Sequence, residues 1–222
     1  MSAAGLPRVI AIDGPTASGK GTVAAAVASA LGFHYLDSGA LYRVVGLAAL
    51  RAGVDLGDAA ALARLALRIA PVFDAGGIVQ DGEDITSLIR TEEVSQAASR
   101  CAIFPAVRQA LLERQQAFRQ PPGLVADGRD MGTVVFPDAC VKIYLTASVG
   151  ERAQRRYKQL IEKGIPATID SLSRDLEERD ARDSGRADAP LAVAPDALVI
   201  DTTGMPIIDA ISAVVAACRE RA

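Results

Sequence analysis

Cysteine and histidine are scarce in this chain, and long apolar runs are missing from it. The three cysteines, Cys101, Cys140 and Cys218, lie far apart and form no C-x-x-C pair. This spacing favours buried thiols in a reducing compartment over a disulfide framework or a metal site. No run reaches the ~18 apolar residues of a membrane span, and the first residues lack an export signal. We therefore expect a cytoplasmic protein with no membrane partner.

The length and composition indicate one folded globular unit. The 222 residues are 50% hydrophobic and 23% charged, and they include no low-complexity tract. This length is enough for one α/β core with a small inserted subdomain. The net charge of -3 gives no reason to expect a nucleic-acid partner. No exposed apolar stripe calls for a second subunit, so we expect a monomer.

Five short apolar runs read as buried strands separated by helical segments. They are Arg8–Asp13, Phe33–Leu36, Gly123–Asp127, Val141–Leu145 and Ala197–Asp201. Strands joined by helical crossovers predict a mainly parallel sheet with helices on both faces, and therefore an α/β fold.

The section from about residue 58 to 120 contains no run of this kind. Helices are expected near 58–69, 91–102 and 105–120, and a β-hairpin joins Val72–Asp74 to Ile78–Gln80. Outside the section, helices are expected near 22–31, 40–52 and 148–163, near 168 onwards, and at the C-terminus. We interpret 58–120 as an insertion into the α/β core.

A glycine-rich loop follows the first strand and fits the phosphate-loop pattern G-x-x-x-x-G-K. Its residues are Gly14, Pro15, Thr16, Ala17, Ser18, Gly19, Lys20, Gly21 and Thr22. The glycines let backbone N–H groups turn toward an anion, and the following helix adds the positive end of its dipole. Lys20 supplies a cation for the β- and γ-phosphates, and a hydroxyl just beyond it can ligate Mg²⁺. The alternative is a chance glycine-rich turn, which the flanking strand and helix disfavour.

Polar clusters follow the second and third strands, and an arginine-rich segment lies between the fourth and fifth. Ligands of open parallel sheets bind at these carboxyl ends. Arg179, Asp183 and Arg186 recur at helical spacing and could clamp phosphate and ribose hydroxyls, although a solvated helix face would also explain them. Transfer to an acceptor that is already a phosphate needs cations more than a base. The only histidine, His34, is therefore interpreted as structural.

Four strings in order resemble the bacterial cytidylate kinases over about residues 8 to 203. They are GPTASGKGT, LDSGALYR, ADGRDMGTVVFPDA and ERDARDSGRADAPL. Adenylate and guanylate kinases share the loop but are not similar in the other strings. The resemblance implies a P-loop NTPase fold with a five-stranded parallel sheet. It also implies a core at about 8–57, 121–147 and 190–222, an NMP-binding insert at about 58–120, and a lid region at about 148–189.

The resemblance also implies which residues act on the donor. ATP would be held by the loop residues Gly14 to Thr22 and, at the lid, by Arg155 and Arg156, with Thr22 on the side of Mg²⁺. The residues expected to assist catalysis are Lys20, Arg129, Arg179 and Arg186. The implied reaction transfers the γ-phosphate of ATP to CMP or dCMP, giving CDP or dCDP in pyrimidine nucleotide metabolism.

For the acceptor the resemblance implies a second set of residues. The CMP-binding set is Ser38, Tyr42, Arg43, Ser99, Arg108, Asp130, Arg179 and Asp183. Within it, Arg43 would grip the monophosphate together with Arg129. Ser99, Arg108 and Asp130 would read the cytosine, and Arg179 and Asp183 would contact the ribose.

Two other functions remain open from the residues alone. A kinase for another small molecule would keep Lys20 and Thr22 and differ in its acceptor pocket. A GTP-dependent switch would use the same loop as a sensor, but the sequence contains no N-K-x-D string to read guanine.

Overall fold

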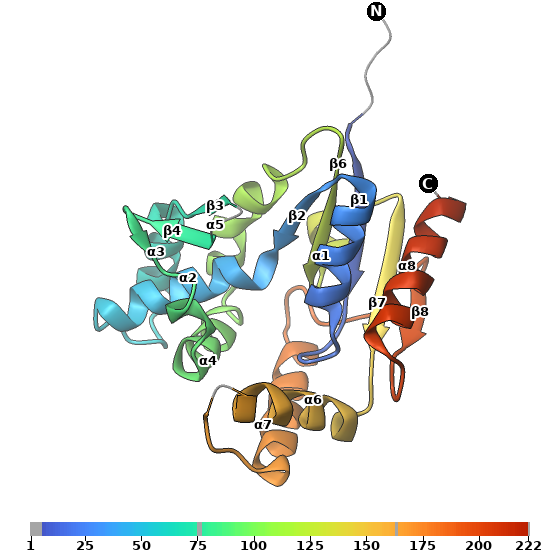
Figure 1. The fold of residues 1–222 in the computed structure, drawn as a ribbon. Coiled ribbons are helices and arrows are strands. Elements are labelled where there is room, and N and C mark those ends of the chain that lie inside the picture. Colours follow the sequence, from blue (N-terminus) through green and yellow to red (C-terminus); the bar gives the residue numbers. More distant parts are fainter. Residues whose placement is uncertain (1–5, 75–76, 163, 222) are drawn as a thin grey trace, which may run out of the picture. The chain divides into compact units, whose positions relative to one another are not determined.

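The core of the protein is one parallel sheet of five strands in the order β2-β6-β1-β7-β8 (Figure 1). The computed structural model describes residues 6–74, 77–162 and 164–221. The strands are β1 (Arg8–Asp13), β2 (His34–Asp37), β6 (Gly123–Gly128), β7 (Val141–Thr146) and β8 (Leu198–Asp201). β1 pairs in parallel with β6 and β7, and β7 pairs in parallel with β8. The predicted α/β sheet is confirmed.

One face of this sheet is covered by α1 (Lys20–Leu31) and α8 (Ile207–Arg221), which lie side by side in Figure 1. The alternating residues Ile10 and Ile12 of β1 point to this face and pack on Val23 and Val27 of α1 and on Val214 of α8. All five are completely buried. Because the strands are held on this face by apolar packing, the polar side chains at their carboxyl ends have fixed positions.

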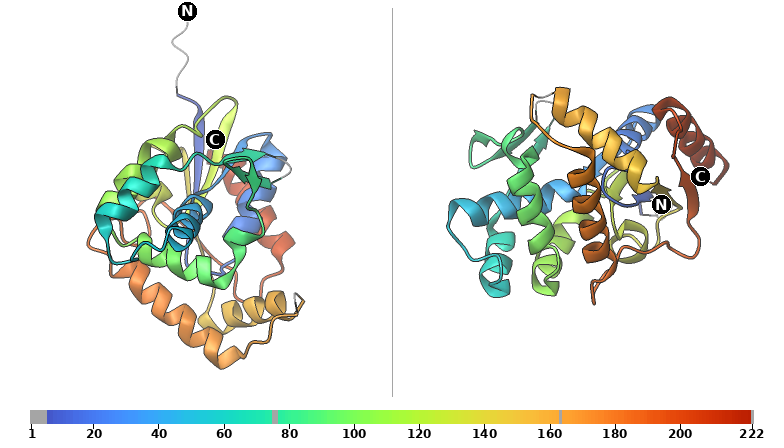
Figure 2. Two further views of the ribbon diagram at one scale, coloured as in Figure 1. Left: turned by 90° about the vertical axis from the view of Figure 1, so that its left-hand side faces the viewer. Right: turned by 90° about the horizontal axis from the view of Figure 1, so that it is seen from below.

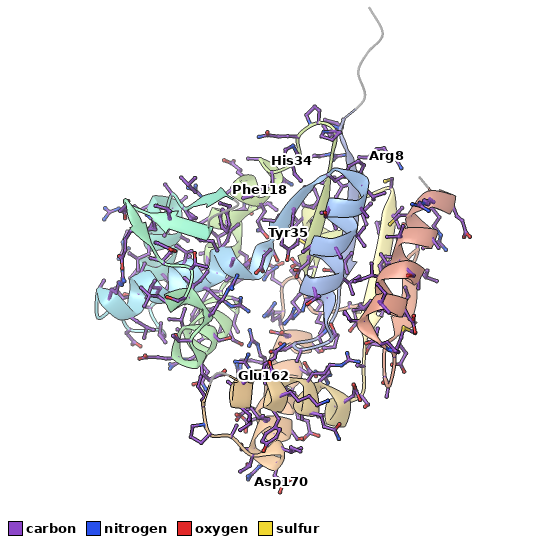
Figure 3. All side chains as sticks on the ribbon, viewed as in Figure 1. Arg8, His34, Tyr35, Phe118, Glu162 and Asp170 are labelled. Carbon is purple, nitrogen blue, oxygen red and sulfur yellow. The ribbon has the colours of Figure 1, made fainter. Side chains whose placement is uncertain are left out.

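A helical hairpin follows β7 and consists of α6 (Val149–Glu162) and α7 (Ile169–Ser184). The two helices pack against each other, and Figure 2 shows them as neighbours in both of its views. Figure 3 labels Glu162 and Asp170, at the end of α6 and the start of α7. The hairpin has a small apolar cluster of its own, formed by Ala153, Leu160, Leu172 and Leu176. Ala17 of the glycine-rich loop packs against this cluster.

Residues Asp37–Ala117 form a second compact unit, while the described parts of Met1–Leu36 and Phe118–Ala222 form the first. The helices of the second unit are α2 (Ser38–Arg51), α3 (Ala59–Arg68), α4 (Glu92–Cys101) and α5 (Pro105–Gln116), with a 3-10 turn at Leu88–Arg90. Its small antiparallel sheet contains β3 (Val72–Asp74), β4 (Gly77–Gln80) and β5 (Glu83–Asp84). This unit begins at Asp37, because α2 packs on α4. The contact is close: a Cβ at Gly46 would lie 2.9 Å from the backbone nitrogen of Ala98.

Some sequence expectations need correction. β5 and the π-helical turn η2 (Met131–Val135) were not expected. α5 ends at Gln116, before the predicted residue 120. The hairpin of the small sheet is present, but its turn residues 75–76 lie outside the described residues. Cys101 and Cys218 are buried as expected, whereas Cys140 is exposed because it stands in the bend before β7.

Candidate active site

The glycine-rich loop wraps closely around the end of β1. A Cβ at Gly14 would lie only 2.0 Å from the backbone oxygen of Leu145 on β7, so no other residue fits there. Ala17 at the tip has φ 61 and Gly19 has φ 89, which are left-handed conformations. The Lys20 side chain is buried and donates from Nζ to the Pro15 carbonyl at 3.1 Å. Its ammonium group therefore lies over the loop, where the sequence predicts a phosphate.

Two arginines of α6 reach the loop through its carbonyl groups. Arg152 donates to the Thr16 carbonyl at 3.1 Å, and Arg155 donates to the Ser18 carbonyl at 3.2 Å. Arg155 is also held by Glu151 at 3.0 Å and by the Thr202 carbonyl at 2.6 Å. The loop is thus braced from the helical hairpin as well as from the sheet.

Asp13 ends β1 and fixes the segment that carries Arg129 and Asp130. Its two carboxylate oxygens accept the backbone N–H groups of Met131 and Gly132, both at 2.8 Å. Burial raises the pKa of Asp13 to about 7, although these two N–H donors act to lower it. The π-helical turn η2 thereby starts at a fixed point beside the loop, and π-helical turns are frequent at functional sites.

Asp183 lies at the centre of a cluster of arginines. Its Oδ2 accepts from Arg129 Nε at 2.9 Å, and its Oδ1 pairs with Arg186. Burial by itself raises the pKa of Asp183, but the charges of Arg129, Arg186 and Arg179 outweigh that effect and hold it below the ordinary value. Arg129 also donates to the Thr16 hydroxyl at 2.6 Å, which joins the cluster to the loop.

The burial of this cluster bears on the solvated-face interpretation of the helix end. The side chains of Asp183 and Arg186 are only 2% and 5% exposed. The solvated-face alternative is therefore wrong for these two residues. Buried charges of this kind are held by their partners and concentrate positive potential at one place, as a site for anions requires.

A cavity of about 270 Å³ opens beside the start of α1. The loop and α1 contribute Ser18, Gly19 and Thr22, and α6 contributes Arg155, Lys158 and Gln159. The remaining walls are Leu145, Thr202, Met205, Ile207 and Ala210. Apolar walls with a few polar groups are typical of a site for a flat organic group such as a base.

The residues near the loop fit a triphosphate with its metal. The Ser18 hydroxyl is buried and has no hydrogen-bond partner among the described residues. The Asp127 carboxylate lies beside Gly21, because a Cβ on that glycine would be 3.3 Å from Asp127 Oδ2. Asp127 Oδ2 also accepts a hydrogen bond from the Tyr35 hydroxyl at 2.6 Å. No group of three or more His, Cys, Asp or Glu side chains in the described part of the chain could hold a metal by itself. Mg²⁺ is usually bound by phosphates, water and one or two protein oxygens, so this arrangement suits it.

The second unit carries its own set of predicted site residues. Asp37 caps α2 by accepting the Ala40 N–H at 3.1 Å, and its other oxygen lies 3.8 Å from Arg43. The guanidinium of Arg108 lies 5.7 Å from the centre of the Tyr42 ring, in the range of a cation–π contact.

Several members of this set are polar and buried. The exposed fractions are 4% for Ser38, 4% for Ser99, 7% for Arg108 and 8% for Tyr42. Buried polar side chains need partners to offset their desolvation, and α2, α4 and α5 supply the surfaces that hold them. Asp130 belongs to the first unit, so the joint geometry of Ser99, Arg108 and Asp130 stays a prediction.

In the first unit the structure brings Arg129 and Asp183 together beside the loop, and in the second unit it brings Arg108 over the Tyr42 ring. Arg156 is half-buried on α6, and its role as a donor contact stays a prediction. His34 is exposed on β2 and contacts the Pro121 carbonyl at 2.9 Å, in agreement with a structural role.

Sequence reasoning missed Arg152 and the cavity residues Lys158, Gln159 and Thr202 as members of the site. The position of Thr202 directly after the fifth strand was a usable signal, because ligands bind at strand carboxyl ends. Arg152 offered none, since a buried arginine on a helix looks like any other charge in the sequence.

Among the described residues no helix is both long and apolar enough to cross a membrane.

Several known proteins are similar to this chain. The family profile described as cytidylate kinase matches residues 10–220. A cytidylate kinase of Bordetella bronchiseptica is 60% identical over 213 residues, which cover 96% of each chain. One of Cupriavidus necator is 57% identical over 206 residues, covering 93% of each chain. A solved gluconokinase from Sinorhizobium meliloti aligns with 97% of this chain and 94% of its own at 15% identity and a TM-score of 0.48.

Proposed function

The chain belongs to the cytidylate kinase family, and from that membership we propose that it transfers the γ-phosphate of ATP to CMP or dCMP. The observation that carries the proposal is the cluster of Lys20, Arg129 and Asp183 around the phosphate loop, inside a chain that matches the family over nearly its whole length. Such transfer needs positioned cations and little covalent chemistry.

The donor is proposed to occupy the first unit. The phosphates would lie on the loop under Lys20, and the base would enter the cavity lined by Arg155, Gln159 and Met205. The charge of Arg129, held by Asp183, would offset negative charge on the group in transit. Arg179 and Arg186 would add to this positive potential, and Arg156 would approach the donor from α6.

The acceptor is proposed to use residues of both units. The Arg43 side chain is 29% exposed, which suits a grip of its guanidinium on a monophosphate. Buried Ser99 and Arg108 offer the donors that a cytosine edge needs, and Asp130 of the first unit would accept from its exocyclic amine. Ser38 and Tyr42 would position the nucleotide.

Mg²⁺ is the proposed cofactor, bound together with ATP. Within the protein, the Ser18 and Thr22 hydroxyls and the Asp127 carboxylate are the oxygens that would approach it, directly or through water. The metal would neutralise charge on the β- and γ-phosphates. We further propose that the enzyme acts in the cytoplasm as a monomer on small molecules, without membrane or nucleic-acid partners. The Asp37–Ala117 unit would correspond to the NMP-binding subdomain, and α6–α7 to the lid.

A coupled assay with ATP and a panel of monophosphates tests the proposal. CMP and dCMP should be turned over in preference to AMP, GMP and UMP, and phosphorylation of AMP or GMP without CMP would exclude the assignment. In Lys20→Ala, kcat should fall by roughly 10²–10³, the usual cost of removing one electrostatic stabiliser. The same panel separates a kinase for another small molecule from the proposed one. Tight guanine-nucleotide binding with slow hydrolysis would instead favour a switch.

A further inference from the structure

Three consecutive residues of the phosphate loop are held from the α6–α7 hairpin, each by a different contact. Thr16 is held through its carbonyl by Arg152, Ala17 by the apolar cluster of the hairpin, and Ser18 through its carbonyl by Arg155. The loop tip therefore depends on the hairpin for its conformation. It does not hold its shape through hydrogen bonds of its own alone.

Arg152 makes the most extensive of these contacts. Its side chain is 4% exposed and uses three donors on three different segments. Nε donates to the Ala147 carbonyl at 3.0 Å, NH1 to the Thr16 carbonyl at 3.1 Å, and NH2 pairs with Asp180 Oδ2 at 2.6 Å. A guanidinium held at three points is rigid, because its planar fork cannot rotate without breaking at least one contact.

The geometry of the peptide bond turns this contact into control of an N–H group. Across a trans peptide bond the C=O of one residue and the N–H of the next point in opposite directions. A Thr16 carbonyl directed at Arg152 therefore directs the Ala17 N–H away from α6. By the same reasoning, the Ser18 carbonyl directed at Arg155 directs the Gly19 N–H away from it. Ala17 at φ 61 needs such external support, since the left-handed region is costly for a residue with a Cβ.

We propose that Arg152 and Arg155 are positioning residues that aim the Ala17 and Gly19 N–H groups at the phosphates by holding the preceding carbonyls, with Arg152 fixed by Asp180. This inference rests on the proposed function, because it takes the loop as a phosphate site. It also assigns Arg155 a second contribution, separate from lining the cavity. Donor affinity is then linked to the conformation of α6–α7, since Asp180 lies on α7.

Backbone amide NMR tests the inference residue by residue. ADP with Mg²⁺ is added to ¹⁵N-labelled protein, and the resonances of Ala17 and Gly19 are followed. In Arg152→Met the change in amide chemical shift that ADP causes at Ala17 should fall to less than half of its wild-type size, while the change at Gly19 persists. Arg155→Met should give the reverse pattern. If the two arginines only stabilised the fold, each substitution would weaken the response to ADP at both amides or at neither.

Steady-state kinetics provides the second measurement. Arg152→Met should raise KM for ATP by about tenfold, the low end for losing a hydrogen bond to a charged group, with KM for CMP changed less than twofold. Arg152→Lys should recover part of this loss. Arg174→Met is the matched control. Within the described part of the chain this exposed arginine on α7 makes only a 3.4 Å contact with the Asp170 carbonyl, so both resonances and both KM values should be unchanged.

The outcomes separate the inference from the proposed function. If ADP moves neither resonance in the wild type, the phosphate-loop assignment fails. If the wild type responds but Arg152→Met keeps the full Ala17 shift, or loses both shifts equally, the inference is overturned. If circular dichroism shows that Arg152→Met is unfolded, the same NMR measurement on Asp180→Asn tests the inference instead. It leaves Arg152 in place without its ion pair, so a reduced Ala17 shift with Gly19 retained supports the inference, and an unchanged Ala17 shift overturns it.

Discussion

Replacing Asp183 by asparagine should expose how much the arginine cluster depends on its central charge. In the wild type, Asp183 Oδ2 lies 2.9 Å from Arg129 Nε, and Oδ1 pairs with Arg186. The asparagine would keep one acceptor and turn an NH₂ group toward a guanidinium that can only donate. Two cations would then remain without their shared carboxylate.

The expected cost follows from burial. Asp183 is 2% exposed, Arg186 5% and Arg129 17%. Breaking a buried ion pair costs about 3–5 kcal/mol, and the partial exposure of Arg129 places Asp183→Asn near the lower end, at about 3 kcal/mol. At roughly 2–4 °C per kcal/mol for a chain of this size, the melting temperature should fall by about 6–12 °C.

Urea unfolding at several pH values is the assay. Because the folded pKa of Asp183 is lowered, its contribution is present at neutral pH and is lost as pH falls through the lowered pKa, below about 4. The difference between wild type and Asp183→Asn should therefore be full at pH 7 and should shrink in acid. Asp175→Asn, an exposed carboxylate on the same helix, should change stability by less than about 0.5 kcal/mol. Equal urea midpoints for wild type and Asp183→Asn at pH 7 would refute the reasoning.

Three further predictions concern other parts of the protein. Gly14→Ala should lower kcat/KM by at least about 10²-fold, because its Cβ would lie 2.0 Å from the Leu145 oxygen and the loop must shift; activity within twofold of wild type in the coupled assay would contradict this. Burial raises the pKa of Asp13 to about 7, so its contribution to stability is full below about pH 4 and is lost as pH rises through about 7. A ¹³C titration of its carboxyl group should inflect near 7, not below 5. Exposed Cys140 should react quickly with a thiol reagent, and this fast phase should be absent in Cys140→Ser. Burial raises the pKa of the Cys101 and Cys218 thiols to about 11, so these two should react slowly.

Local patterns in the sequence were sufficient for the sheet and the loop. An apolar run such as Arg8–Asp13 followed by G-x-x-x-x-G-K specifies a buried strand, a tight turn and a helix over about twenty residues, and each step depends on neighbours in the chain. Asp58, Thr91 and Thr168 each cap a helix by accepting the N–H of the third residue along, so these helix starts also depend on neighbours in the chain.

The second compact unit has local sequence signals for its helices and strands but none for where it begins. Its hairpin and helices have local signals, whereas its boundary at Asp37 depends on α2 packing against α4, about fifty residues further along the chain. Contacts of that range leave no periodic pattern in the sequence. The π-helical turn after Arg129 was missed for a related reason, because it is held by Asp13, which lies on β1.

The chemistry of the arginines was decided only by the tertiary structure. From the sequence, Arg152, Arg155, Arg179 and Arg186 are charges in one polar segment, and a solvated helix face remained an alternative for Arg179 and Arg186. Folding buries Arg152 against the Thr16 carbonyl and Arg186 against Asp183, and it leaves Arg174 in solvent. Charge and residue type are properties of the sequence, but desolvation and the choice of partner depend on which distant segments meet. The sequence by itself therefore predicted a phosphate site at this loop, and the tertiary structure decided which cations hold the loop in shape.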